Sequence, residues 1–248
     1  MAGWVVIAFV GGLTMGSYAT AVAHRVPRGI STVMQRSQCP TCGAQIAAYD
    51  NIPVISWALL RGRSRCCGTH ISPRYPLTEL CVGLLFAATA IVYRDDPAEA
   101  VIGCVFVTML AAVTLTDLER RIIPNKILLA GSILCIAIAA PTDPSGLAER
   151  AIAAAAAGGL LFVVVLAYPA GMGLGDVKLA AAMGLFLGRA VAPAILAALL
   201  FGSIVGLALI ARHGSQARKM AIPFGPFLAL GGIVGLLAGD QLIDLYLG

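Results

Sequence analysis

Two aspartates beside apolar sequence are the residues of this chain best placed to do chemistry. Asp176 follows a run of alternating glycines, Gly171, Gly173 and Gly175, and apolar sequence lies on both sides of it. An ionisable side chain beside membrane-length apolar segments is costly, so it marks a functional site by default. Glycines let backbone or a ligand come close, and a helix can break within a membrane where the backbone lines a cavity. The stretch therefore predicts a polar site set into a membrane.

The second aspartate, Asp117, ends an apolar segment that starts near residue 100. The apolar run after Asp176 reaches only Gly188, which as a helix covers roughly 20 Å at ~1.5 Å per residue, whereas the hydrocarbon core is ~30 Å thick. Asp176 is therefore expected below one membrane surface, at the same depth as Asp117. Two carboxylates close together in a low dielectric hold one proton between them. One can then take a proton from water while the other polarises a peptide carbonyl.

Simpler roles for the two aspartates also agree with the sequence. Asp117 could pair with Arg120 or Arg121, three and four residues further along a helix. Asp176 could cap the N-terminus of its own helix. Glu119 competes with Asp117 as the second carboxylate, but two residues along a helix its side chain points elsewhere.

The composition places these residues in a membrane protein. The chain has 248 residues, of which 59% are hydrophobic and 12% are charged, and its mean hydropathy is +0.91. A soluble domain carries about twice that charged fraction. Apolar segments alternate with short charged loops, so the expected fold class is all-α, a polytopic membrane protein in a lipid bilayer with about eight transmembrane helices. The positively charged residues that give the chain its net charge of +5 lie between these segments, so nucleic-acid binding is not expected.

The positive charges predict the orientation of the helices. Fourteen of the 17 lysines and arginines fall on one side of the predicted membrane, in segments that include the loop at 212–219. The other three, Arg94, Arg150 and Arg189, fall on the opposite side. By the positive-inside rule, both termini lie outside and the long polar segment is cytoplasmic. The predicted parts are a first, uncleaved transmembrane helix at 1–23, a cytoplasmic Cys-containing loop domain at 24–76 and a seven-helix membrane core at 77–248.

Four cysteines gather in this predicted cytoplasmic loop. Cys39-Pro40-Thr41-Cys42 is followed about 25 residues later by Cys66-Cys67-Gly68, and the pattern resembles a structural zinc site. The spacing is imperfect, because a second Cys-x-x-Cys pair would need a cysteine where the chain has Ser64. Cys66, or less readily His70, could supply the fourth ligand. Alternatively, other contacts hold the loop and the thiols are redox-sensitive.

Together these features resemble the type IV prepilin peptidase family, the bifunctional leader peptidase/N-methyltransferases. The GxGD stretch alone is shared with presenilin-like proteases, whereas the whole ordered set is highly specific. In chain order the matching elements are Gly16-Ser17, Cys39-Pro40-Thr41-Cys42, Asn51-Ile52-Pro53, Ser56-Trp57, Arg61-Gly62, Cys67-Gly68, Ile71-Ser72-Pro73-Arg74-Tyr75-Pro76 with Glu79, Asp117 with Ile123-Pro124, and Gly173-Leu174-Gly175-Asp176-Val177-Lys178.

The resemblance implies an aspartic endopeptidase of the bacterial inner membrane. It would remove the short basic leader of prepilins and pseudopilins after a glycine, at the cytoplasmic face. Asp117 and Asp176 match the family's two catalytic aspartates, and Gly173, Gly175 and Lys178 belong to the matching active-site loop. Lys178 stands two residues from Asp176, so its side chain is expected to extend toward the membrane surface instead of facing the carboxylate.

The resemblance also implies S-adenosylmethionine-dependent methylation of the new N-terminus. The α-amine must lose a proton before it attacks, and a nearby carboxylate such as Glu79 could take that proton. Ser64 departs from the tetracysteine pattern of the family, which bears on zinc binding and methylation, whereas the aspartates that leader cleavage needs lie elsewhere in the chain.

A membrane transporter is the competing class. A small transporter with a helix broken near the membrane midplane could use Asp117 and Asp176 to bind a cation or relay protons. Inverted repeats would favour this class, and none is evident in the sequence. The long cysteine-bearing loop also has no obvious role in a transporter.

Overall fold

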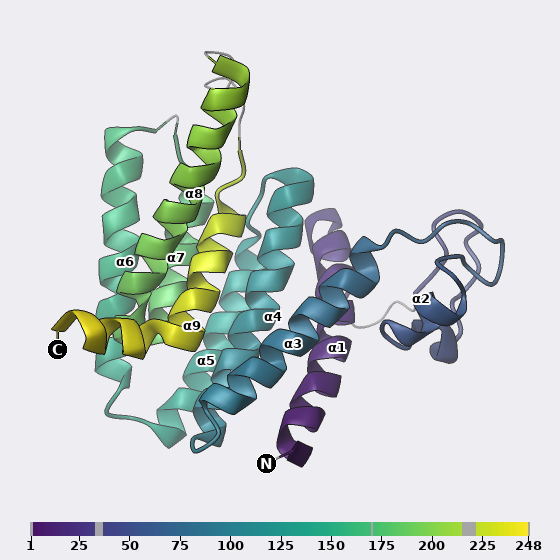
Figure 1. Cartoon of the computed structure of the whole chain (residues 1–248), viewed down its shortest axis with the longest axis horizontal. Helices are drawn as coiled ribbons and strands as arrows, with labels where there is room; N and C mark the ends of the chain where they lie inside the picture. Colours follow the sequence, from purple (N-terminus) through teal and green to yellow (C-terminus); the bar gives the residue numbers. More distant parts are fainter. Residues whose placement is uncertain (1, 33–36, 170, 215–221, 248) are drawn as a thin grey trace. The chain divides into compact units, whose positions relative to one another are not determined.

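The computed structural model describes residues 2–32, 37–169, 171–214 and 222–247 (Figure 1). Residues 215–219 of the predicted loop at 212–219, which include Arg218 and Lys219, lie outside the described residues. The chain divides into two compact units, Met1–Asp95 and Asp96–Gly248. The predicted division at residues 23 and 76 stays a prediction. The first unit contains α1 (Ala2–Arg25), η1 (Val26–Arg28), η2 (Ala48–Asn51), α2 (Ile55–Leu59) and α3 (Arg74–Val92). The second contains α4 (Pro97–Arg120), α5 (Asn125–Thr142), α6 (Leu147–Ala167), α7 (Leu174–Leu187), η3 (Gly188–Ala190), α8 (Val191–His213) and α9 (Gly225–Leu247).

The described helices confirm an all-α polytopic membrane protein. Seven helical segments among the described residues are long and apolar enough to cross a membrane. One of them, Leu174–His213, has 40 residues because α7 continues through η3 into α8. The long helices α1 and α3 to α9 follow the predicted order, so the prediction of about eight helices agrees with this arrangement.

Small residues let α1 and α3 approach closely in the first unit. A Cβ atom added at Gly12 would lie 2.7 Å from Cα of Gly83, and one at Gly16 would lie 2.7 Å from Cα of Glu79. Close backbone approach through glycine is a common way for membrane helices to associate. Gly12 and Gly16 therefore let α1 pack closely against α3.

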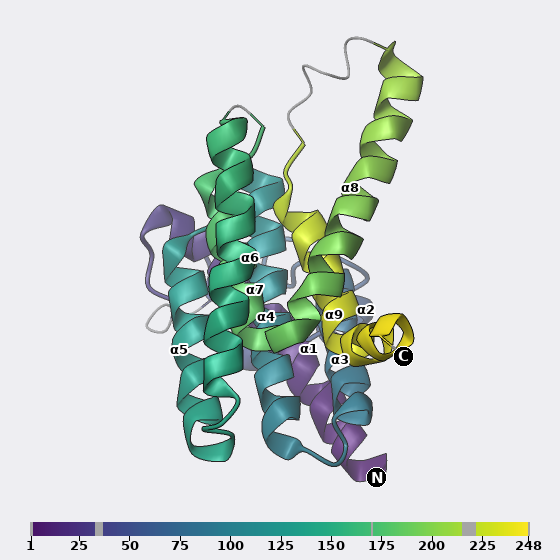
Figure 2. The ribbon, with the colours of Figure 1, turned by 90° about the vertical axis from the view of Figure 1, so that its left-hand side faces the viewer.

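In the second unit, α7 is enclosed by other helices. It contacts α4, α5, α6 and α9, and Figure 2 shows it behind α6. Phe186 of α7 stacks on Phe106 of α4 with 4.9 Å between the ring centroids. A Cβ atom at Gly184 would come within 2.5 Å of the Ala153 backbone in α6. The alanine-rich start of α6 and the small residues of α7 therefore pack almost backbone to backbone.

The helix α7 is short, as predicted, and buried polar groups meet its C-terminal end. Its 14 residues span about 21 Å at ~1.5 Å per residue. The Arg150 guanidinium donates hydrogen bonds to the carbonyls of Leu185, at 3.4 Å, and Phe186, at 2.8 Å, and pairs with the Glu99 carboxylate. The last carbonyls of a helix have no partner within it, so Arg150 satisfies two of them where α7 stops.

The last helix of the chain continues past the charged residue that interrupts its apolar sequence. The apolar stretch that the charged residue Asp240 interrupts belongs to α9, which continues to Leu247. Figure 1 shows α9 bending before its end, so that its last turns run in a different direction from its first turns. A charged residue ends the apolar pattern, whereas backbone hydrogen bonds decide where the helix ends.

Candidate active site

A pocket with a volume of about 260 Å³ lies where α4 ends and where α5 and α7 begin. A water molecule takes about 30 Å³ of liquid volume, so the pocket has room for a water molecule and a peptide bond. Both aspartates singled out in the sequence line it, as do all three residues of the predicted active-site loop. The complete lining is Asp117, Arg121, Ile122, Ile123, Asn125, Gly173, Gly175, Asp176 and Lys178.

Asp117 is buried in the last turn of α4. Its Oδ2 atom accepts a hydrogen bond from the backbone N–H of Gly225, at 2.9 Å. The helix stops at Arg121, which takes a left-handed φ of 54° while its N–H bonds to the Asp117 carbonyl at 2.9 Å. Within the described part of the chain, Asp117 forms no ion pair with Arg120 or Arg121, so the pairing that the sequence also allowed is absent.

Asp176 is buried in the first turn of α7 and does cap that helix. Its Oδ2 atom accepts the N–H of Gly173, the N-cap residue, at 3.1 Å. Glycine has no side chain, so the reciprocal bond of a capping box is missing. Asp176 therefore both caps α7 and lines the pocket. Asp117 and Asp176 each have one carboxylate oxygen that accepts a hydrogen bond from a glycine N–H.

The two glycines before Asp176 meet different surroundings. A Cβ atom at Gly175 would lie 3.1 Å from Cβ of Ile123, whereas one at Gly173 would meet no atom closer than 3.6 Å. Neither residue has a left-handed φ. Gly175 is therefore needed for the close approach of the α4–α5 connection, and Gly173 contributes its N–H.

Lys178 extends from α7 to α5, as expected of a side chain that does not face Asp176. Its Nζ donates a hydrogen bond to Oδ1 of Asn125 at 3.1 Å, and the side chain is exposed. Glu119, the competing carboxylate, is exposed on α4 and does not line the pocket. The sequence reasoning considered Arg121 only as an ion-pair partner of Asp117, and it missed Ile122, Asn125 and Gly225. Gly225 has only the Gly-Pro pair at the start of the last apolar segment as a local signal.

The cysteine loop of the first unit contains two similar turns. In the first, Cys39 N–H bonds to the Ala44 carbonyl at 2.8 Å and Gly43 N–H bonds to the Cys39 carbonyl at 2.9 Å. In the second turn, Ser64 N–H bonds to the Thr69 carbonyl at 2.8 Å and Gly68 N–H bonds to the Ser64 carbonyl at 2.9 Å. Gly43 and Gly68 have left-handed φ values of 73° and 69°. Position 64, which holds Ser64, is thus the counterpart of Cys39.

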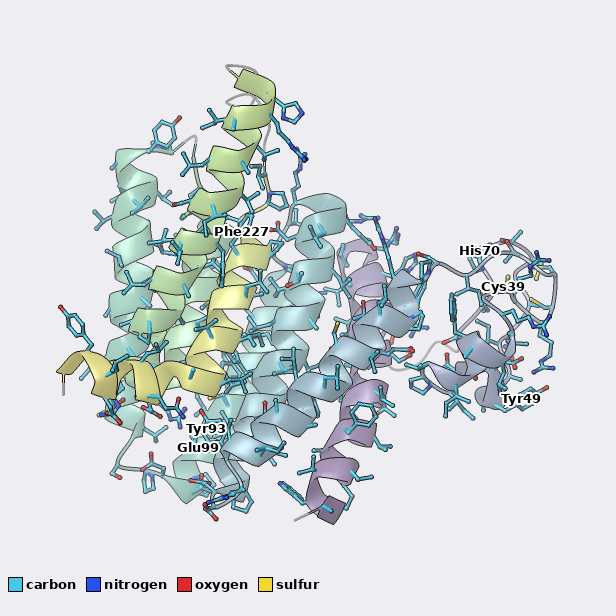
Figure 3. The ribbon with its side chains drawn as sticks, viewed as in Figure 1. Cys39, Tyr49, His70, Tyr93, Glu99 and Phe227 are labelled. Carbon is cyan, nitrogen blue, oxygen red and sulfur yellow. The ribbon has the colours of Figure 1, made fainter. Side chains whose placement is uncertain are left out.

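Cys66 supplies the fourth sulfur of the cluster, two residues from the expected position. The Sγ atoms of Cys39 and Cys67 are 3.6 Å apart, those of Cys42 and Cys66 are 3.3 Å apart, and all four lie within 4.8 Å of one another. A tetrahedral zinc ion with Zn–S bonds of ~2.3 Å places sulfur atoms roughly 3.8 Å apart. The four cysteines fit such an ion. His70, which Figure 3 labels in the same loop, is not in the group.

Local hydrogen bonds favour the thiolate form of two of these cysteines. The backbone N–H groups of Cys42 and Thr41 lower the pKa of Cys39 to about 6. A hydrogen bond from Ser64, whose Oγ is 3.2 Å from the sulfur, lowers the pKa of Cys67. Thiolates are the metal-binding form of cysteine, so Ser64 supports a sulfur ligand without being one.

Glu79 belongs to the first unit and lies buried near the start of α3. Its Oε2 accepts the backbone N–H of Val54 at 2.7 Å, and Ser17 of α1 also hydrogen-bonds its side chain. Val54 has a φ of 61°, which is rare for a β-branched residue. Glu79 therefore ties the cysteine-bearing loop to the α1–α3 pair.

A pocket with two buried carboxylates in a bundle of membrane helices is the kind of site that membrane-embedded hydrolases and ion carriers use. Comparison with known proteins decides between these classes. Residues 10–93 match the Bacterial Peptidase A24 N-terminal domain, and residues 104–211 match the Type IV leader peptidase family. No solved structure matches the chain significantly.

Several similar proteins are each named prepilin leader peptidase/N-methyltransferase. The one from Bacillus subtilis (strain 168) is 34% identical over 97% of both chains. The one from Aeromonas hydrophila is 33% identical over 97% of this chain and 93% of its own. The one from Myxococcus xanthus (strain DK1622) is 37% identical over 87% of this chain and 66% of its own. This chain belongs to the type IV leader peptidase family.

Proposed function

We propose that this protein removes the leader peptide from prepilins or pseudopilins and that Asp117 and Asp176 are its catalytic residues. The observation that carries the proposal is that both carboxylates, 59 positions apart in the chain, line one pocket together with the GxGD loop. The names of the relatives support the substrate class. The apolar helices and the charge distribution support a multi-pass protein of the bacterial inner membrane with its cysteine loop in the cytoplasm.

The proposed reaction needs one ionised and one protonated carboxyl group. The ionised carboxylate takes a proton from a water molecule, whose oxygen bonds to the scissile carbonyl carbon. The other carboxyl group donates a proton to the carbonyl oxygen and so stabilises the tetrahedral intermediate. The C–N bond then breaks as the first carboxyl group gives the proton it took from water to the leaving nitrogen, which becomes the new N-terminal amine. The other carboxylate takes back its proton from the hydroxyl group of the intermediate as the carbonyl of the leader re-forms. Two carboxylates that share one proton supply both functions at once.

The same protein is proposed to methylate that amine, as the names of its relatives suggest. S-adenosylmethionine, when bound, would supply the methyl group. The amine must first lose a proton, and Glu79 is the buried carboxylate of the first unit, held by hydrogen bonds from the Val54 N–H and from Ser17. We expect Glu79→Gln to leave leader cleavage intact while mass spectrometry finds no methyl group on the mature N-terminus. A methylated product would remove Glu79 from this role.

Replacing each aspartate by asparagine tests the peptidase proposal, because asparagine keeps the shape and removes the titrating group. Membranes carrying Asp117→Asn or Asp176→Asn should contain normal amounts of protein and should not cleave a prepilin-like substrate, with losses of at least about 10³-fold, the scale set by removal of an acid–base group. Glu119→Gln, on an exposed neighbouring carboxylate, serves as the control. Cleavage at the wild-type rate by both variants would contradict the proposal and would favour cation or proton transport instead.

We further propose that Cys39, Cys42, Cys66 and Cys67 bind a structural zinc ion, with Cys66 in place of the residue expected at position 64. The purified protein should contain about one zinc ion per chain, which Cys66→Ser should lose. The double variant Ser64→Cys/Cys66→Ser, which restores the regular Cys-x-x-Cys spacing, should retain it. Metal analysis of the purified proteins measures this. Full zinc content in Cys66→Ser alone would show that Cys66 is not a ligand.

A further inference from the structure

We infer that Gly225 is a positioning residue for Asp117, so that the first turn of α9 forms part of the proposed peptidase site. The inference deepens the proposed function and rests on it. The relevant contact joins two residues 108 positions apart, the last turn of α4 and the first residue of α9.

The hydrogen bonds of the first turn of α9 leave one N–H for Asp117. The first N–H groups of a helix have no partner within it. Pro226 has none to offer, and those of Phe227 and Leu228 bond to the Phe224 carbonyl at 3.0 and 3.1 Å. The N–H of Gly225 instead donates to Oδ2 of Asp117 at 2.9 Å. Asp117 thus caps α9, and a carboxylate is well placed at this positive end of a helix.

The approach of α9 to this carboxylate has room only for glycine. A Cβ atom at Gly225 would lie 2.7 Å from Oδ2, 3.2 Å from Cγ and 3.3 Å from Cβ of Asp117. The φ of Gly225 is not left-handed, so space, and not backbone conformation, requires glycine here. Any side chain at this position must displace the Asp117 carboxylate or the start of α9.

Packing on both sides keeps the start of α9 from moving away. A Cβ atom at Gly202 of α8 would lie 3.2 Å from the Phe224 ring, and that ring lies 6.1 Å from the ring of Phe227. Figure 3 labels Phe227 at this end of α9. Further along α9, Gly232 sits against Phe106 and Leu110 of α4. A side chain at Gly225 is therefore expected to move the carboxylate more than the helix.

A displaced Asp117 should affect the chemical step more than substrate binding. The Gly225 N–H holds Oδ2 and leaves the other oxygen to act on water or on the scissile carbonyl. Misplacement of a catalytic group by about 1 Å can cost ~100-fold in rate. Gly225 itself is not among the residues that line the pocket, so its contacts with a substrate are not what a substitution would remove.

The test is steady-state cleavage of a prepilin-like substrate by purified full-length Gly225→Ala. We expect kcat to fall about 10- to 100-fold, within the range that misplacement by an ångström allows, while KM changes less than about twofold. Two alanine variants are the controls. Gly235→Ala crowds the same helix, because its Cβ would lie 2.7 Å from Cβ of Ala194, and Gly206→Ala adds a methyl group with nothing within 4 Å. Gly235→Ala should lose stability without this selective loss of kcat.

A second measurement tests the hydrogen bond without a substitution at Gly225. Asparagine at position 117 keeps an acceptor for the Gly225 N–H, whereas alanine removes it. The thermal midpoint of Asp117→Ala should therefore be lower than that of Asp117→Asn. Equal midpoints, a wild-type kcat in Gly225→Ala, or the same kinetic change in Gly235→Ala would each overturn the inference. If the inference about Gly225 fails while Asp117→Asn and Asp176→Asn are inactive in the same assay, the proposed function still stands. If both asparagine variants are active, the proposed function itself is wrong.

Discussion

Gly173 and Gly175 stand two positions apart in one motif, yet their surroundings require different things of them. Gly175 gives Ile123 its space, since a Cβ atom there would come within 3.1 Å of the Ile123 side chain, while one at Gly173 would make only an ordinary contact, 3.6 Å from Oδ2 of Asp176. The glycines of a loop of this kind are therefore not interchangeable, and substitutions can separate their roles.

We expect Gly175→Val to lower kcat/KM for leader cleavage at least about tenfold, a loss of ~1.4 kcal/mol of transition-state stabilisation. The reason is that valine would push Ile123 and the pocket wall that it forms with Asp117 and Asp176. The matched variant Gly173→Ala keeps its N–H and should stay within about threefold of the wild type. Cleavage assays on equal amounts of membrane protein measure both. A more damaged Gly173→Ala would contradict this assignment of roles.

At the scale of single residues, the sequence predicts the groups that carry charge and misses those that act through their backbone. Asp117 and Asp176 stand out because carboxylates are costly beside membrane-length apolar sequence. Gly225 does not, because its contribution is an N–H that every residue except proline possesses. Ser64 lies between these cases: the sequence marks it as a departure from a pattern, but only the geometry shows its hydroxyl beside the Cys67 sulfur.

At the scale of elements, the short helix α7 is fixed at both ends by polar groups. Gly173 and Asp176 satisfy its first turn, and Arg150 of α6 satisfies carbonyls of its last turn. The Arg150 side chain is only 10% exposed, and its partner Glu99 is 25% exposed. This pair therefore joins α4, α6 and α7 at the end of α7 away from the aspartates.

Arg150→Leu should lower the free energy of unfolding by about 3 kcal/mol, because it leaves the Glu99 carboxylate and the Phe186 carbonyl without their partner. The control is Arg189→Ala, which breaks an ion pair with Asp240 whose two side chains are 60% and 58% exposed. An exposed pair contributes less than about 1 kcal/mol. Unfolding in mixed detergent micelles measures both changes. Equal effects of the two substitutions would mean that the bonds of Arg150 to Glu99 and to the end of α7 stabilise the protein no more than an exposed ion pair does.

The order of the helices and the shortness of α7 are predictable because both follow from runs of apolar residues. The depth argument for Asp176 needs only the 13 residues from Asp176 to Gly188 and the thickness of a bilayer. The contacts that assemble the pocket are not predictable in the same way. Ile123 and Asn125 reach it because Arg121 takes a left-handed conformation, and arginine gives no signal for such a turn.

At the scale of the whole molecule, the charge distribution predicts which parts face the cytoplasm. A membrane-impermeant thiol reagent should not label the new thiol of Tyr49→Cys, at an exposed position of the loop that is not a proposed zinc ligand, until cells are permeabilised. A phosphatase fused after Gly248 should be active, because the positive-inside rule places that end outside. Labelling of the loop in intact cells, or an inactive fusion, would reverse the predicted orientation.

The short length of α7 also gives the proposed peptidase a way to choose its cleavage point. A helix of about 21 Å leaves roughly 9 Å of a ~30 Å hydrocarbon core for the pocket and the chain that enters it. A pilin whose own apolar helix fills the membrane would present the residues just before that helix at this level. The enzyme would then act as a depth gauge, and moving the start of the pilin's apolar stretch would move the bond that is cut.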